Sequence, residues 1–198
     1  MSEWWTYRLS DFLMFSPATY WRLLERYNRE VWPLHLLAIA AGAMLLWWVA
    51  VRARAAGQLA AAVLAAVWLW VGWAFHWQRY APINWAAEYF AMAFALQAVL
   101  LFAVAATAKV GDTPPAGPLV RAGGLALAAI GVFAYPFLAF AAGRPWSQAE
   151  VFGLMPDPTA LATLGFLLAT RLPRRGWLAV IPALSLAVGL ATALLLRP

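Results

Sequence analysis

Residues 86–107 read AAEYFAMAFALQAVLLFAVAAT, an apolar run in which Glu88 is the one charged residue and Gln97 the one amide. A helix rises about 1.5 Å per residue, so a run of this length matches the roughly 30 Å hydrocarbon core of a bilayer. The stretch predicts a transmembrane helix, and it sets the expected fold class as an all-α membrane protein.

The composition extends this prediction to the whole chain. Of its 198 residues, 65% are hydrophobic and 11% are charged, whereas a soluble domain is about half apolar and a quarter charged. This balance excludes a soluble enzyme and a disordered tail. The absence of Cys excludes disulfides, thiolate metal sites and Cys nucleophiles. The net charge of +6 is scattered between apolar runs, which indicates orientation in a lipid bilayer rather than nucleic-acid binding.

Five further apolar runs lie at 33–51, 58–78, 122–142, 151–170 and 177–196. Together with 86–107 they predict a bundle of six transmembrane helices over residues 33–198. Pro136 is expected to kink the fourth span. The fifth span is interrupted by Pro156-Asp157-Pro158, where either a short helix starts with Asp157 as its N-cap or a broken element enters the membrane.

Residues 1–32 are predicted to form an amphipathic segment at the membrane interface. Ser16-Pro17 is typical of a helix start. At 100° per residue, the Arg and Glu residues of 20–32 fill one arc and the aromatic and aliphatic residues fill the other. Asn28 is the exception, because it falls inside the apolar arc.

Six spans would place both termini and the loops at 79–84 and 143–157 on one side, which we call the first face. Seven of the eight acids belong to this face, and both histidines lie near it. When the amphipathic segment is set aside, more Lys and Arg lie on the opposite face, so we expect that face in the cytoplasm. The predicted location is the bacterial inner membrane, with both termini outside the cytoplasm.

The polar residues near the first face form the candidate site for a ligand or partner. Glu88 lies about one turn inside its span, where acids are rare and usually paired or functional, and Arg79 is its expected partner. Asp157 suits either an N-cap or a helix start directed at a ligand. The neighbouring Trp and Tyr residues also fit an interfacial aromatic belt. The candidate residues are Asn28, His76, Arg79, Asn84, Glu88, Gln97 and Asp157.

His35 and His76 lie at similar depths on two antiparallel neighbouring spans. Two facing imidazoles would suit haem b iron or part of a copper or zinc site, and a zinc site would need Glu88 or Asp157 as well. Satisfied interfacial histidines are the preferred explanation of the pair, ahead of haem or a metal ion. The sequence contains no phosphate loop, paired helical His motif or nucleophile elbow, which disfavours an enzyme.

Three stretches carry a family resemblance: Tyr27-Asn28-x-x-x-Trp32-Pro33, His76 through Ile83-Asn84 to Gln97, and Phe152-Gly153 through Pro156-Asp157-Pro158-Thr159. Together they resemble a bacterial family of small multi-pass membrane proteins described as a domain of unknown function. The resemblance implies that Asn28, His76, Asn84, Gln97 and the Pro-Asp-Pro element occupy motif positions. That family often has Cys at the position of Asp157 and Gln at that of His35, so neither Cys chemistry nor haem held by His35 is implied.

Three functional hypotheses follow. The leading one is a non-enzymatic integral membrane protein, an accessory scaffold or ligand-binding subunit that holds another membrane subunit or a small ligand at the first face. The second is a small permease or channel that uses Glu88 and the Pro156-Asp157-Pro158 break. The third is a haem- or metal-binding redox subunit that uses His35 and His76.

Overall fold

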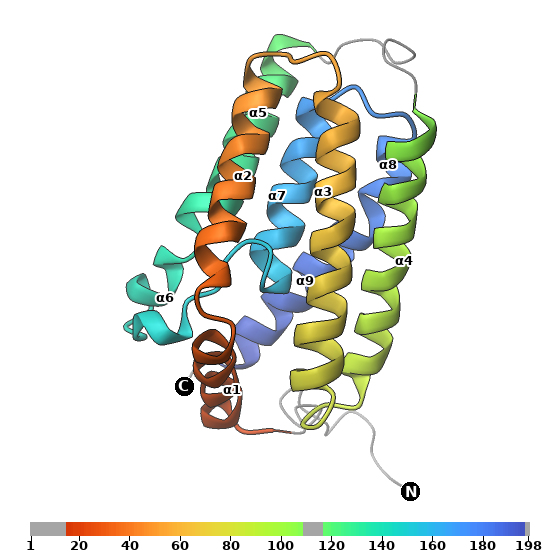
Figure 1. Ribbon diagram of the computed structural model, residues 1–198. Helices are drawn as coiled ribbons and strands as arrows, with labels where there is room; N and C mark the ends of the chain where they lie inside the picture. The colour runs from red at the N-terminus through yellow and green to blue at the C-terminus, as the bar shows by residue number, and fades with distance from the viewer. Residues whose placement is uncertain (1–14, 109–116, 197–198) are drawn as a thin grey trace, which may run out of the picture.

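The computed structural model describes residues 15–108 and 117–196, and within them it is all-α. The helices correspond to the predicted runs, and Figure 1 shows most of them packed side by side in a bundle. Their bounds are α1 (Pro17–Glu30), α2 (Leu34–Ala50), α3 (Ala56–Trp70) continuing as π-helix η3 (Val71–Tyr80), α4 (Ala86–Thr107), α5 (Pro118–Ala129) continuing as π-helix η4 (Ile130–Ala134), α6 (Phe137–Ala141), the 3₁₀ turn η5 (Trp146–Gln148), α7 (Pro156–Ala169), α8 (Arg175–Leu178) and α9 (Val180–Leu195).

Three helical stretches among the described residues are long and apolar enough to cross a membrane: 56–80, 86–107 and 175–195. A fourth exists if α1 and α2, which meet at an angle of 85°, are counted as one bent span. The other predicted runs form shorter helices. The 14 residues of α7 extend about 21 Å, because the chain becomes helical only at Pro156 and not at residue 151.

Helix α7 is the centre of the packing, and Figure 1 shows it in the middle of the bundle. Residues on all its sides are buried. It packs closely on α5, where both backbones carry small residues. A methyl group placed on Gly124 would lie 2.7 Å from the backbone nitrogen of Ala169 and 2.8 Å from the carbonyl oxygen of Gly165. Glycine at such positions lets two helix backbones approach more closely than any larger residue would allow.

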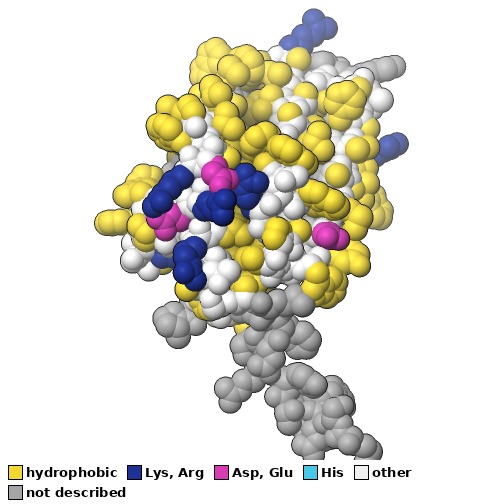
Figure 2. Space-filling view, turned by 60° about the horizontal axis from the view of Figure 1, so that its bottom comes forward, with side chains coloured by type: hydrophobic (Ala, Val, Ile, Leu, Met, Phe, Trp, Pro, Cys, Tyr) yellow, Lys and Arg dark blue, Asp and Glu magenta, His cyan; other side chains and the backbone are white. Residues whose placement is uncertain are grey.

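Helix α1 lies across one end of the bundle and confirms the predicted amphipathic helix (Figure 1). The Ser16 hydroxyl accepts a hydrogen bond from the Thr19 backbone nitrogen at 3.2 Å, as an N-cap does. Leu24 and Tyr27 are buried, while Arg26 is exposed and pairs with Glu30 at 2.8 Å. Figure 2 shows charged side chains gathered at this end of the molecule beside a largely hydrophobic surface.

The end of the bundle under α1 also holds the turn after η3 and the segment between α6 and α7. Arg79 of η3 forms an ion pair with Glu30 of α1, with 2.6 Å between Nη2 and Oε2. Asn28 of α1 bonds to the segment that contains η5. These are the loops that the sequence grouped on the first face, and in the structure they lie together.

Candidate functional site

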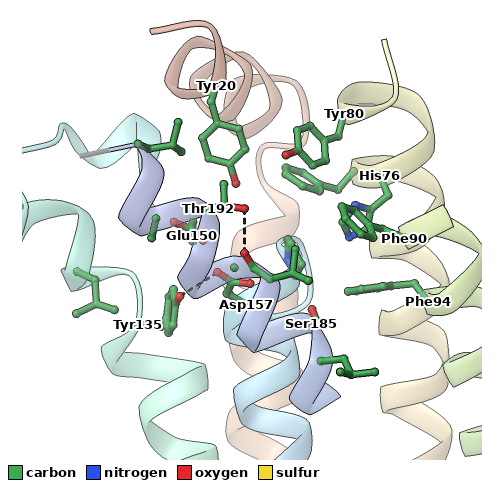
Figure 3. A pocket seen from close by; sticks show the side chains of 18 of the residues that line it. Tyr20, His76, Tyr80, Phe90, Phe94, Tyr135, Glu150, Asp157, Ser185 and Thr192 are labelled. Atoms are coloured by element: carbon green, nitrogen blue, oxygen red, sulfur yellow. Dashed lines mark hydrogen bonds between the residues drawn. The ribbon is translucent and has the colours of Figure 1, made fainter. Parts of the chain in front are cut away.

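A cavity of about 970 Å³ lies at this end of the bundle, between α1, η3, α4, α7 and α9. Most of its wall is apolar or aromatic, and polar groups converge on it from separate helices (Figure 3). The polar lining residues are Tyr20, His76, Tyr80, Tyr135, Arg144, Glu150, Asp157, Ser185 and Thr192.

Two π-helical stretches flank the cavity and position its polar side chains. In η3 the Ala81 nitrogen bonds to the His76 carbonyl at 2.9 Å, and after η4 the Tyr135 nitrogen bonds to the Ile130 carbonyl at 2.8 Å. Such five-residue spacings widen the helix and shift the direction of every side chain that follows. π-Helical turns occur often at functional sites, and here they place His76 and Tyr135 on the cavity wall.

His76 is buried, with 4% of its surface exposed, and neither ring nitrogen has a hydrogen-bond partner among the described residues. Aromatic rings surround it, and the Phe94 ring centroid lies 4.6 Å from that of His76. A buried polar group without a partner costs about 1–3 kcal/mol. The imidazole is therefore available to hydrogen-bond a molecule that enters the cavity.

Asp157 lies on another wall of the cavity, in the first turn of α7. Met155 is the N-cap residue and Pro156 follows it, so the prediction that Asp157 caps the helix is wrong. The reason is that the helix begins at Pro156 and not at Pro158, so Asp157 lies inside the helix. Its carboxylate accepts a hydrogen bond from the Tyr135 hydroxyl at 3.3 Å.

Gly189 of α9 makes the space that the Asp157 carboxylate occupies. A methyl group on Gly189 would overlap the carboxylate oxygens. Ser185 and Thr192, on the same helix, also line the cavity. The face of α9 that meets α7 is thus small and weakly polar, although the rest of the helix is aliphatic.

A second carboxylate, Glu150, lines the cavity beside a cation. Arg144 lies 3.7 Å from Glu150, and its guanidinium also sits 4.1 Å from the centroid of the Trp21 ring. Burial raises the pKa of Glu150, while Arg144 acts in the opposite direction. The charge of Glu150 therefore has a partner within the wall.

Of the seven predicted ligand-site residues, the structure brings His76 and Asp157 to the cavity. Asn28 instead donates from Nδ2 to the carbonyls of Ser147 and Ala149, both at 2.9 Å. Its Oδ1 lies 2.9 Å from Nε2 of His35. Asn28 thus joins α1 to the segment before α7, which explains why a polar residue interrupts the apolar arc of α1.

The predicted Arg79–Glu88 pair is wrong, because Arg79 pairs with Glu30. Hydrogen bonds from Arg26 and Arg79 lower the pKa of Glu30. Glu88 is exposed in the first turn of α4, outside the cavity. Asn84 precedes the N-cap residue of the same helix, Trp85, and accepts a hydrogen bond from the Ala86 nitrogen at 3.1 Å.

Gln97 is fully buried and donates to the Leu178 carbonyl at 2.9 Å, as expected for an amide that joins neighbouring helices. His35 does not line the cavity, and its Nε2 faces Asn28. In residues 15–108 and 117–196, no three His, Asp or Glu side chains are grouped so as to hold a metal ion.

The model of one protein family matches residues 18–197, which include every residue of the cavity wall. Its description is "Family of unknown function (DUF6064)". The chain belongs to this family. No curated protein and no solved structure matches the chain. The membership of DUF6064 therefore assigns no activity, and the function has to be argued from the cavity.

Sequence reasoning missed most of the polar wall in this DUF6064 protein. Ser185, Gly189 and Thr192 are spaced four and three residues apart in the last apolar run. This spacing places them on one face of a helix, which is the feature that could have indicated the polar wall. Tyr20 lay in the apolar arc of α1, where an aromatic ring gives no indication of a cavity. Tyr80 and Tyr135 likewise resemble interfacial aromatics until the helices are packed.

Proposed function

We propose that this DUF6064 protein is a non-enzymatic integral membrane protein that binds a small amphipathic molecule in the cavity under α1. The observation that carries the proposal is the cavity itself. Its volume of about 970 Å³, its aromatic wall and its few convergent polar groups are the properties of small-molecule sites, which commonly span about 300–1,000 Å³.

The membrane setting forms part of the proposal. We place six spans along the helical runs, with α1 at the interface and both termini outside the cytoplasm of a bacterial inner membrane. Large apolar side chains on the bundle surface support lipid contact, among them Leu36, Trp47 and Phe102, each more than half exposed. Part of the irregular segment before α7 fits this setting, because Ser147 and Ala149 bond to Asn28 of α1 and residues 151–155 are buried.

The ligand-binding reading has more support than the permease and redox readings. The permease hypothesis combined Asp157 with Glu88, and Glu88 lies outside the cavity. The redox hypothesis needed His35 beside His76, and the His35 Nε2 faces Asn28. The ligand-binding hypothesis retains His76 and Asp157, which both line the cavity.

The Ala93→Phe protein is expected to lose ligand binding. Ala93 of α4 lines the cavity, so the added ring would occupy ligand space without removing a polar group. Small molecules that remain bound to the full chain in lipid nanodiscs can be identified by native mass spectrometry. We expect a molecule bound to the wild type and about tenfold or more lower occupancy in Ala93→Phe.

Ala103→Phe is the matched control, because Ala103 lies on the exposed surface of the same helix. It should retain the molecule as the wild type does. Equal occupancy in all three proteins would contradict the proposal, and so would a wild-type protein that carries no small molecule.

A further inference from the structure

We propose that the ligand of this cavity is a protonated amine with an apolar or aromatic body, and that Asp157 is its counter-ion. The inference rests on the proposed function and specifies the ligand class for the same site. It is carried by the charges of the wall, by its aromatic rings and by the unpartnered His76.

The charges of the wall leave one carboxylate uncompensated. Among the described residues that line the cavity, the charged side chains are Arg144, Glu150 and Asp157. Arg144 and Glu150 are paired at 3.7 Å, with 17% and 14% of their side chains exposed. Among these residues, Asp157 has one hydrogen-bond partner, the neutral hydroxyl of Tyr135, at 3.3 Å. No cation of the described wall is paired with Asp157, and a cationic ligand would supply one.

The same charges disfavour the other ligand classes. An anion would enter a cavity that holds two carboxylates and one cation, and like charges at close range oppose binding. A neutral ligand would bury Asp157 without compensating it. An ammonium group both compensates the charge and donates hydrogen bonds to the carboxylate.

The aromatic wall favours a cation with an apolar body. Tyr20, Tyr80 and Phe90 line the cavity beside the polar groups (Figure 3). The faces of such rings attract cations, and the attraction is larger where water is excluded. Trp21 already shows this contact in the wall, because it lies against the Arg144 guanidinium at 4.1 Å. Apolar ligand atoms would fill the remaining aromatic surface.

His76 is a separate observation which indicates that the ligand of the cavity has hydrogen-bonding groups. Its ring is 4% exposed and lacks a partner at both nitrogens among the described residues. In Figure 3 it lies across the cavity from Tyr135. A neutral imidazole accepts one hydrogen bond and donates one, so a polar group on the ligand would satisfy a group that is otherwise costly to bury.

Three probes with one body and different charges test the inference: 2-phenylethylammonium, 2-phenylethanol and 3-phenylpropanoate. Binding to the full chain in neutral-lipid nanodiscs is measured from the shift in thermal unfolding midpoint across a concentration series. We expect the ammonium to bind about tenfold or more tightly than the alcohol, and the carboxylate to bind more weakly still. Asp157→Asn should remove the preference for the ammonium over the alcohol.

Glu88→Gln is the matched control, because Glu88 is an exposed acid outside the cavity. It removes the same charge and should preserve the order of the three probes. The comparison of probes on the wild type decides whether the ligand is an amine even if Asp157→Asn does not fold.

The possible negative results distinguish an error in the amine inference from an error in the proposed function. If the alcohol or the carboxylate binds as tightly as the ammonium, and Ala93→Phe abolishes that binding, the amine inference is overturned and the proposed function stands. If Asp157→Asn keeps the ammonium preference, Asp157 is not the counter-ion and the inference is overturned. If no probe stabilises the wild type, the amine inference is overturned, and the occupancies measured for the wild type and Ala93→Phe decide the proposed function separately.

Discussion

The Gly124→Leu protein is expected to lose about 3 kcal/mol or more of its folding free energy. A Cβ at this position would lie 2.7 Å from the Ala169 nitrogen and 2.8 Å from the Gly165 carbonyl oxygen. Both neighbours are backbone atoms of α7, so no change of rotamer can relieve the overlap. The two helices would have to separate, and α7 contacts most of the bundle.

The matched control is Gly123→Leu, one residue away on the same helix. Gly123 is exposed, and a Cβ there would meet nothing within 4 Å. Because Leu favours a helix more than Gly does, this variant should stay within about 1 kcal/mol of the wild type or gain stability. Unfolding midpoints of both variants in one detergent give the comparison, and equal losses would contradict the close packing of α5 on α7.

Asn28→Leu and His76→Leu are expected to change stability in opposite directions. Asn28 is buried with its amide bonded to the carbonyls of Ser147 and Ala149, so Leu would leave these acceptors unpaired and cost about 3 kcal/mol. His76 is buried without a partner among the described residues. Leu has a similar volume and no polar atom, so this change should stabilise the ligand-free protein by about 1 kcal/mol.

The same change at His76 should weaken ligand binding. A variant that is more stable and less active is the pattern expected where a site keeps an unfavourable group for function. Unfolding midpoints are measured on ligand-free protein, and 2-phenylethylammonium binding is measured in parallel. A loss of stability in His76→Leu comparable to that in Asn28→Leu would show that the imidazole is an ordinary packing element.

The helices could be predicted from sequence because their signals are local. The run at 86–107 became α4 with the predicted bounds, and Ser16-Pro17 starts α1 as expected. Hydropathy predicted the lengths of the helices less well than their positions. The runs at 122–142 and 151–170 contain Pro136 and Pro156, and the structure divides or shortens the helices at these residues. Apolar composition continues through such breaks, although helical geometry does not.

The site could be predicted only in part, because it depends on contacts between distant segments. Nearness in sequence favoured Glu88 as the partner of Arg79, and tertiary packing supplied Glu30 instead. An α-helical wheel also does not apply to residues 71–80, since η3 changes the angle between successive side chains. His76 was identified as polar and close to the first face, but its direction depends on that irregular segment.

The two π-helical segments also bear on how this cavity can change in evolution. An α-helix has 3.6 residues per turn, so loss of a single residue from 71–75 would rotate the preceding part of the helix by about 100° relative to His76. One in-frame codon deletion would thereby tend to restore regular α geometry, with the imidazole withdrawn from the cavity while the lipid-facing composition stayed the same. A deletion of one codon here would therefore change the direction of the His76 side chain without changing the hydropathy of the run.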